Sequence, residues 1–302
     1  LQMNENLLRG MTRDGSARIL VLNATEMVQN AMRIHHTAPT ASAALGRVLI
    51  AASLMGCMLK DKENSLTLRF QGDGDAGTVL AVSDYMGNVK GTIGNPDADA
   101  PRKSNGKLDV RAVVGHGDLY VIRDTGEKKP YVGITKIVSG EIAEDIANYF
   151  AESEQIPTVC ALGVLVGAEE SCVAAGGVMI QLLPYAAEET VAKLEKNAEK
   201  LANVSDLFHQ GLTNAQIAEI ACAGVEFDVF DALHAEYHCD CSKERMARAL
   251  LTLPPKELFD LLVKDGKIET RCHFCNRTYT FTGADIEEAR KKAGRTQPTE
   301  KK

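Results

Sequence analysis

Apolar and polar positions follow different patterns in successive parts of the chain. Up to residue 183, short runs typical of strands are mixed with stretches that are apolar at helical spacing. The expected strands are 17–22, 65–70, 78–82, 89–93, 119–123, 131–137, 158–166 and 172–183, and the expected helices are 26–34, 41–59 and 140–150. Because helices interrupt a run of strands, the pattern predicts an α+β domain of mixed sheet and helix over residues 3–183.

The pattern changes at Pro184. Residues 187–202 have only a thin apolar stripe at helical spacing, and Thr213-Asn214-Ala215-Gln216 is a capping box that predicts a helix over 215–222. A further apolar cluster follows at 227–233. We interpret residues 184–235 as a small helical linker domain, which must pack on its neighbours because it has too few apolar residues to form a core of its own.

The last part of the chain predicts a small module over residues 236–285. Two helices are expected at 243–251 and 254–263, the second with proline at its start. Two extended runs, 267–271 and 277–281, then predict a hairpin. We expect residues 286–302 to be a tail, disordered from residue 293.

Two close cysteine pairs carry the candidate chemistry. They are Cys239-Asp240-Cys241 and Cys272-His273-Phe274-Cys275, the second at the tip of the predicted hairpin. Four thiolates at such spacing can converge on one tetrahedral ion, and zinc is the usual occupant of a site with four sulfur ligands. We therefore predict one Zn²⁺ per chain, held by Cys239, Cys241, Cys272 and Cys275. His238 and His273 adjoin these positions and are alternative ligands.

Composition sets the expected surroundings of these cysteines. The 302 residues are 45% apolar and 25% charged, as in soluble globular proteins, and no uninterrupted apolar run reaches the roughly 18 residues of a membrane span. We see no signal peptide and expect a cytoplasmic protein without membrane association, where paired cysteines bind metal or react with oxidants more often than they form permanent disulfides. The other four cysteines lie in apolar runs and are expected to be inert: Cys57, Cys160, Cys172 and Cys222.

Charge argues against partners rich in phosphate. Residues 236–302 carry 14 Lys and Arg against 11 Asp and Glu, whereas the rest of the chain carries 20 against 30. An acidic body repels nucleic acid. The segment Gly72–Gly77 resembles a phosphate loop only loosely and lacks its lysine, so we expect a hairpin turn there and no bound nucleotide.

The cysteine ligands that would hold the module together can be oxidised, which predicts a redox switch. Metal binding to small zinc domains contributes about 10–16 kcal/mol, against the about 5–15 kcal/mol that keeps a whole domain folded, so loss of the ion should unfold the module. Peroxide and hypochlorous acid attack thiolates. Cys272 and Cys275 can close a disulfide once the turn relaxes, and Cys239 and Cys241 can close a strained, easily reduced one. We therefore expect oxidation to eject the metal, unfold residues 236–285 and expose apolar surface on the linker.

The sequence also resembles a known family. Residues 239–245 and 272–276 are similar to the signature of the 33 kDa heat-shock chaperone family, the redox-regulated holdases, and the resemblance covers essentially the whole chain. Asp75 stands where this family usually has proline, which affects only a turn. Further matching segments are Ala44–Arg47, Asn105–Arg111, Ser139–Ile142, Ser153–Gln155 and Ala174–Gly177.

This resemblance implies a cytoplasmic, ATP-independent chaperone and no enzyme activity. It implies an inactive form with four reduced cysteines on zinc. Oxidation would pair Cys239 with Cys241 and Cys272 with Cys275, unfold the linker and favour an active homodimer that binds unfolding client proteins.

Other classes of protein fit the motifs less well. A purely structural zinc ribbon would leave the tight Cys-x-Cys pair without a role. His234-Ala235-Glu236 with Cys272 and Cys275 imitates the pattern of a zinc deaminase, in which histidine and two cysteines hold zinc and glutamate moves protons. Arg271, however, replaces the proline of that pattern, and Cys239 and Cys241 go unexplained. A thioredoxin-type motif should open a helix, whereas a strand follows this one.

Overall fold

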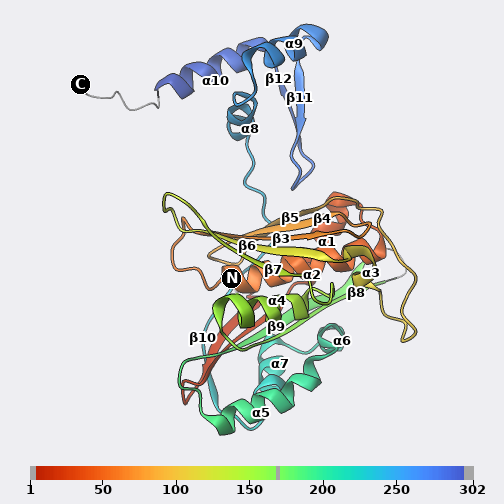
Figure 1. Ribbon diagram of the computed structural model, residues 1–302, viewed down its shortest axis with the longest axis vertical. Coiled ribbons are helices and arrows are strands. Elements are labelled where there is room, and N and C mark those ends of the chain that lie inside the picture. Colours follow the sequence, from red (N-terminus) through yellow and green to blue (C-terminus); the bar gives the residue numbers. More distant parts are fainter. Residues whose placement is uncertain (1–4, 168–170, 296–302) are drawn as a thin grey trace, which may run out of the picture. The chain divides into compact units, whose positions relative to one another are not determined.

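The computed structural model describes residues 5–167 and 171–295, and it divides into two compact units (Figure 1). The first unit spans Leu1–His238 and the second spans Cys239–Lys302. Both mix helices with antiparallel strands. The predicted α+β class is therefore confirmed. Whether residues 184–235 act as a functional linker stays a prediction.

The first unit contains two antiparallel sheets of five strands each. The first sheet has the order β10-β1-β2-β9-β8, with β1 Leu7–Thr12, β2 Ala17–Asn23, β8 Thr158–Val166, β9 Cys172–Leu182 and β10 Phe227–Leu233. The second has the order β5-β4-β3-β6-β7, with β3 Ser65–Gly72, β4 Thr78–Asp84, β5 Val89–Ile93, β6 Gly117–Asp124 and β7 Tyr131–Lys136. The strands predicted between residues 17 and 183 are all present, and the segment 72–77 turns from β3 to β4 as expected.

One helix fills the space between the two sheets. Helix α2 (Pro39–Gly56) contacts strands of both, and Pro39 occupies its first turn, where the missing N–H costs nothing (Figure 1). By length and composition it is the one helix of the described residues that could cross a membrane, but 89% of that window is buried inside the protein, as expected of a core helix. Around it lie α1 (Thr25–His35), α3 (Val110–Val114), α4 (Ala143–Tyr149) and the π-helix η1 (Phe150–Glu154).

The linker helices pack on the first sheet. They are α5 (Glu188–Ala198), the 3-10 helix η2 (Glu199–Leu201), α6 (Val204–His209) and α7 (Asn214–Ala221). The predicted capping box of α7 is present, since the Thr213 N–H donates to Gln216 Oε1 at 2.9 Å and Thr213 Oγ1 accepts from the Gln216 N–H at 3.3 Å.

Two glycines let helix α6 approach the sheet closely. Gly163 and Gly176 are cross-strand partners on β8 and β9, and a Cβ on Gly176 would lie 2.1 Å from Phe208 of α6. Phe208 is buried in the second core of this unit. This core joins side chains of the sheet to side chains of the helices: Leu8, Ile19, Val21 and Ile180 with Leu194, Leu201, Val204 and Ile217.

The end of the predicted linker is a strand, which corrects the expectation of an all-helical segment 184–235. Residues 227–233 form β10, which pairs with the edge of the sheet at β1. Its exposed face carries Val229 and Phe230, which are 49% and 63% exposed. A short apolar run does not distinguish a helix from a strand, and here pairing with the free backbone groups of β1 decides the outcome.

The described part of the second unit, residues 239–295, consists of three helices and one hairpin. Its elements are α8 (Lys243–Leu250), α9 (Pro255–Asp265), β11 (Ile268–Arg271), β12 (Thr278–Phe281) and α10 (Gly283–Arg295). Both predicted helices and the predicted hairpin are present. The apolar core is small and comprises Ala247, Leu250, Leu258, Ile268, Phe281 and Ile286.

Helix α10 corrects the expectation that the module ends at residue 285 and that 286–302 is a tail. Ile286 is only 2% exposed and belongs to the core of the second unit. The helix start has a sequence signal, because the Thr282 N–H donates to Asp285 Oδ2 and the Asp285 N–H to Thr282 Oγ1. Of the predicted disordered segment 293–302, residues 293–295 lie in α10 and the rest lies outside the described residues.

The packing of α6 predicts a large effect of Phe208→Ala. Removing a buried phenylalanine from a closely packed contact costs about 3–5 kcal/mol. We expect the free energy of unfolding of the first unit, measured by urea denaturation, to fall by that amount. Leu207→Ala, at the partly buried neighbouring position, is the control and should have a clearly smaller effect. Equal losses in both variants would show that α6 is not docked as described.

Candidate metal centre

The hairpin of the second unit presents one cysteine pair. Strands β11 and β12 end in the pair Arg271↔Thr278, and the turn between them is closed by two backbone hydrogen bonds. The Cys272 N–H donates to the Arg277 carbonyl and the Asn276 N–H to the Cys272 carbonyl, both at 2.9 Å. Asn276 has φ of 58°, a left-handed conformation that asparagine tolerates better than most residues. This tight turn directs the sulfurs of Cys272 and Cys275 to the same side.

The other pair lies just before helix α8. Ser242 caps this helix by accepting a hydrogen bond from the Arg245 N–H at 3.2 Å. Arg245 also forms an ion pair with Asp240, the residue between Cys239 and Cys241. The start of the helix therefore fixes the backbone of the Cys-x-Cys segment.

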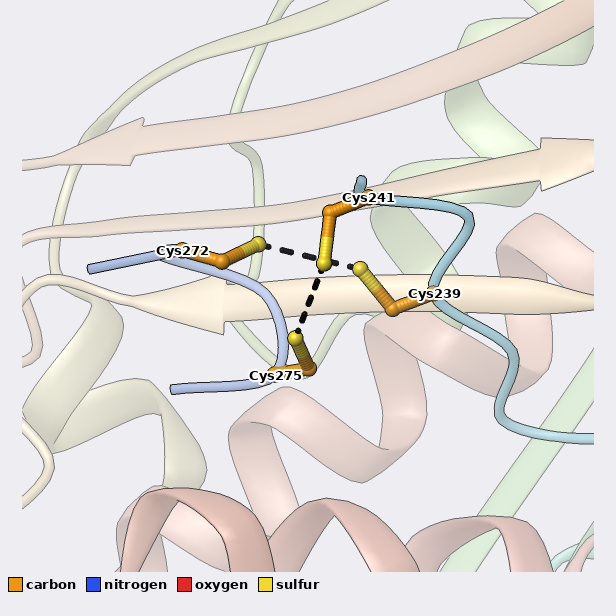
Figure 2. Close-up of side chains that lie close together, drawn as sticks. All are labelled: Cys239, Cys241, Cys272 and Cys275. Carbon is orange, nitrogen blue, oxygen red and sulfur yellow. Dashed lines mark hydrogen bonds between the residues drawn. The ribbon is translucent and has the colours of Figure 1, made fainter. Parts of the chain in front are cut away.

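The two pairs meet at a single point (Figure 2). All four Sγ atoms lie within 4.8 Å of one another, with Cys239 and Cys272 at 3.7 Å and Cys241 and Cys275 at 3.3 Å. A tetrahedral zinc with Zn–S bonds of about 2.3 Å requires sulfurs about 3.8 Å apart. All eight cysteines are free thiols. The four sulfurs therefore fit one tetrahedral ion, with small adjustments.

Tyr279 supports the cluster from outside. Its hydroxyl lies 3.1 Å from Cys241 Sγ and donates to the Cys241 carbonyl at 3.1 Å. Sequence reasoning missed this residue, although it stands four positions after Cys275 on a short strand. Groups of this kind orient the ligands of metal sites.

The four thiols differ in acidity. Burial by itself would raise the pKa of Cys241, but hydrogen bonds from Tyr279 and the neighbouring thiols outweigh it and lower the pKa to about 7. Burial raises the pKa of Cys239 and of Cys275, and hydrogen bonds with neighbouring thiols add to the effect. In the absence of metal the cluster therefore shares protons unequally, and a metal ion displaces them when it binds.

The remaining cysteines lie apart from this chemistry. Burial raises the pKa of each to about 12, including Cys160, which keeps some exposure. Such thiols carry almost no thiolate at neutral pH. The prediction that Cys57, Cys160, Cys172 and Cys222 are inert fits these environments.

Histidines do not join the cluster. Within residues 5–167 and 171–295, the one group of cysteine, histidine and acidic side chains close enough to hold a metal consists of the four cysteines. His234, His238 and His273 are outside it. The arrangement gives a role to Cys239 and Cys241, which the deaminase pattern leaves unexplained.

Comparison with known proteins identifies the family. The family model described as Hsp33 protein matches residues 5–282. The chain belongs to this family. The 33 kDa chaperonin of Ruminiclostridium cellulolyticum is 42% identical over 94% of this chain and 97% of its own, and that of Bacillus pumilus is 40% identical over 96% and 99%.

A solved structure agrees with the sequence relatives. The crystal structure of the 33 kDa chaperonin of Thermotoga maritima superposes with a TM-score of 0.87 at 36% identity, and covers 97% of this chain and 100% of its own. The resemblance inferred from the cysteine motifs is confirmed. Membership of this chaperone family does not favour the deaminase alternative.

The contact of Tyr279 with Cys241 predicts an effect on metal affinity. Loss of a group that orients a ligand typically weakens metal binding 10- to 100-fold, so we expect Tyr279→Phe to lower zinc affinity by about 10-fold or more. Competition with a chromophoric chelator measures this. The matched control is Tyr185→Phe, because Tyr185 is fully exposed in the first unit. Unchanged affinity in Tyr279→Phe would mean that the hydroxyl does not support the site.

Proposed function

We propose that this chain is a redox-regulated, ATP-independent holdase whose sensor is the four-cysteine cluster. One observation carries the proposal: four thiols from two separate segments of a small unit, 239–241 and 272–275, lie within 4.8 Å of one another. Membership of the Hsp33 family supports chaperone activity in place of enzyme activity. Cys239, Cys241, Cys272 and Cys275 would hold one Zn²⁺, which when bound would crosslink the start of α8 to the β11–β12 hairpin.

The second unit has little else to hold it together. Among the residues that the structure describes, its buried apolar core comprises six, of which one is an alanine. Exposed ion pairs such as Lys243–Asp285 add little, because water and salt screen them. A structural metal contributes about 10–16 kcal/mol in comparable domains, so we infer that this unit is folded with its ligands bound and unfolds without them.

The oxidation step is a two-electron reaction at each cysteine pair. One hydrogen peroxide takes two electrons from two thiols: its O–O bond breaks, one S–S bond forms, and the oxygens leave as two waters. Two peroxides oxidise all four thiols, which then no longer bind metal. Reductants reverse the reaction by thiol–disulfide exchange.

We propose the pairings Cys239–Cys241 and Cys272–Cys275, although the shortest sulfur contacts cross between the pairs. Those contacts reflect a folded cluster. In an unfolded chain the nearest thiol is the pair partner, since closing a loop of over 30 residues costs about 2 kcal/mol more than closing one of about three. Strain in the small Cys-x-Cys ring offsets part of this difference.

The linker supplies the surface that oxidation would expose. Helices α5–α7 cover an apolar face of the first sheet, which includes Ile19, Val21 and Ile180. If these helices detach, both that face and their own apolar sides become available to unfolding client proteins. Formation of a homodimer by the oxidised form, a cytoplasmic location, and independence from membranes, nucleotide and nucleic acid belong to the same proposal.

Zinc release and chaperone activity should rise together. We expect peroxide with mild heat to release one zinc per chain, measured with a metal-sensitive dye, and to switch on suppression of client aggregation, measured by light scattering. Dithiothreitol should reverse the activity. If the reduced, zinc-bound protein suppresses aggregation as well as the oxidised protein, the redox control is wrong.

Cysteine variants test which cysteines bind zinc and respond to peroxide. Cys272→Ser should lose tight zinc binding and the response to peroxide, because it removes one of the four ligands. Cys160→Ala is the control: it lies on β8, outside the cluster, and should keep both. A normal peroxide response in Cys272→Ser would contradict the assigned sensor.

Disulfide mapping tests the pairings independently. Mass spectrometry of the peroxide-treated protein, digested at low pH to prevent exchange, should recover Cys239–Cys241 and Cys272–Cys275. Recovery of Cys239–Cys272 and Cys241–Cys275 instead would show that oxidation occurs in the folded cluster, before the second unit opens.

A further inference from the structure

The first unit contains a cavity that the proposed function does not use. It has a volume of about 170 Å³ and lies where the two sheets, the end of α2 and the π-helix η1 come together. The lining is apolar on one part and charged or polar on another. The apolar part comprises Met55, Met58, Leu59, Leu66, Phe150 and Ile156, and the polar part comprises Arg18, Arg123, Glu154 and Gln181.

Arg123 and Glu154 neutralise each other. Arg123 Nη2 lies 2.9 Å from Glu154 Oε1, and the Tyr149 hydroxyl donates to the same oxygen at 2.6 Å. This part of the wall has no net charge, because the Arg123 guanidinium and the Tyr149 hydroxyl both bond the Glu154 carboxylate. The polar character of the cavity therefore depends on Arg18 and Gln181.

Arg18 is a cation without a counter-ion. Its Nε atom is buried with no hydrogen-bond partner, and its guanidinium forms no ion pair within the described residues. Burial lowers the pKa of Arg18, which reflects the cost of removing its charge from water. Cys57 is its electrostatic neighbour, but burial raises the pKa of that thiol to about 12, so it is neutral. An anion in the cavity would offset the cost of burying this charge.

Gln181 offers an acceptor next to this cation. It is 1% exposed and is the direct cross-strand partner of Arg18 on β9. Its Nε2 donates to Thr158 Oγ1 at 3.2 Å, and the Thr158 hydroxyl donates its own proton to the Ile156 carbonyl at 2.9 Å. This chain of donors fixes the orientation of the amide. Gln181 Oε1 is left buried without a partner, and only a hydrogen-bond donor can satisfy it.

We propose that this cavity binds a small 2-hydroxy carboxylate with a short apolar chain. Its carboxylate would accept from Arg18, its hydroxyl would donate to Gln181, and its chain would lie against Met55 and Leu59. Cross-strand partners have Cβ atoms about 4.5–5.5 Å apart, which suits two groups on adjacent atoms of one ligand. A cavity of about 150 Å³ holds benzene, so this one holds a compact chain of similar size. The wall formed by η1 fits this assignment, because π-helical turns recur at functional sites.

A matched series of ligands tests each contact by calorimetry on the reduced, zinc-loaded full chain. The probes are 2-hydroxyisovalerate, isovalerate, which lacks only the hydroxyl, and isobutanol, which lacks only the carboxylate. We expect saturable binding of 2-hydroxyisovalerate, about 5- to 10-fold weaker binding of isovalerate, and none of isobutanol, because a neutral hydrogen bond contributes less than one to a charged group.

Two variants assign the contacts to residues. Gln181→Met should abolish the difference between 2-hydroxyisovalerate and isovalerate, and Arg18→Met should weaken both by about 10-fold or more. Arg33→Met, at an exposed arginine of α1, should leave binding unchanged. If Arg18→Met lowers the thermal unfolding temperature, Arg18→Lys replaces it and should bind with intermediate affinity, since it keeps the charge but loses the planar fork.

Three results would overturn the proposal. They are the absence of saturation at tens of millimolar ligand, equal binding of 2-hydroxyisovalerate and isovalerate by the unaltered chain, and full affinity in the Arg18 variants. A high-resolution structure with 2-hydroxyisovalerate that shows only water between Arg18 and Gln181 would do the same. None of these results bears on the redox proposal, because the cavity lies in the first unit and the cysteine cluster in the second.

Discussion

The convergence of four sulfurs on one point is the constraint on which the second unit depends. Among its described residues, a core of six buried apolar side chains is small for three helices and a hairpin, and the cysteines come from two segments about 30 residues apart in sequence. The same sulfurs that would hold an ion are partly exposed and include one thiol with a pKa of about 7. In the proposed function the same atoms would therefore supply both the stability of the unit and its sensitivity to oxidants.

The cysteines of the first unit are buried and weakly acidic, unlike those of the cluster, and its helices are held by apolar packing. Its thiols have a pKa raised to about 12 by burial, which protects them from the oxidants that the cluster would detect. Its linker helices are held by apolar contacts and by the close approach at Gly163 and Gly176, and none of the four cluster cysteines belongs to that core. Chemical change at the cluster thus leaves the first unit intact unless the effect is transmitted along the chain.

The sequence predicts most of the fold because its patterns are local. Alternation marks the strands, Thr213 and Gln216 mark a helix start, and the cysteine spacing marks the metal centre. The sequence-based expectations are wrong where contacts between distant parts of the chain determine the structure. Strand β10 forms because β1 offers a free edge. Helix α10 has a local start signal in Thr282 and Asp285, but its place in the unit depends on packing, since Ile286 joins a core with residues as distant in sequence as Ala247. The cavity at Arg18 and Gln181 could not be predicted from the sequence for the same reason, because it depends on the register of β2 against β9.

The chain segment that leads to the cluster is hydrogen-bonded to the second sheet of the first unit. Val89 of β5 accepts from the His238 N–H at 2.8 Å and donates to the Glu236 carbonyl at 2.9 Å, so the segment is pinned to the edge of the second sheet. The Tyr237 hydroxyl adds bonds to both backbone groups of Gly91.

The hydrogen-bonded segment lies between β10 and Cys239, the first residue of the second unit. Unfolding of the second unit therefore reaches a set of hydrogen bonds before it reaches the linker. Those bonds hold only one short segment, and each contributes only about 0.5–1.5 kcal/mol. If oxidation unfolds the second unit as proposed, mild heat would then suffice to break these bonds. The proposed switch would in that case respond to an oxidant combined with unfolding stress, because the hydrogen bonds at Val89 and Gly91 stand between the cluster and the linker.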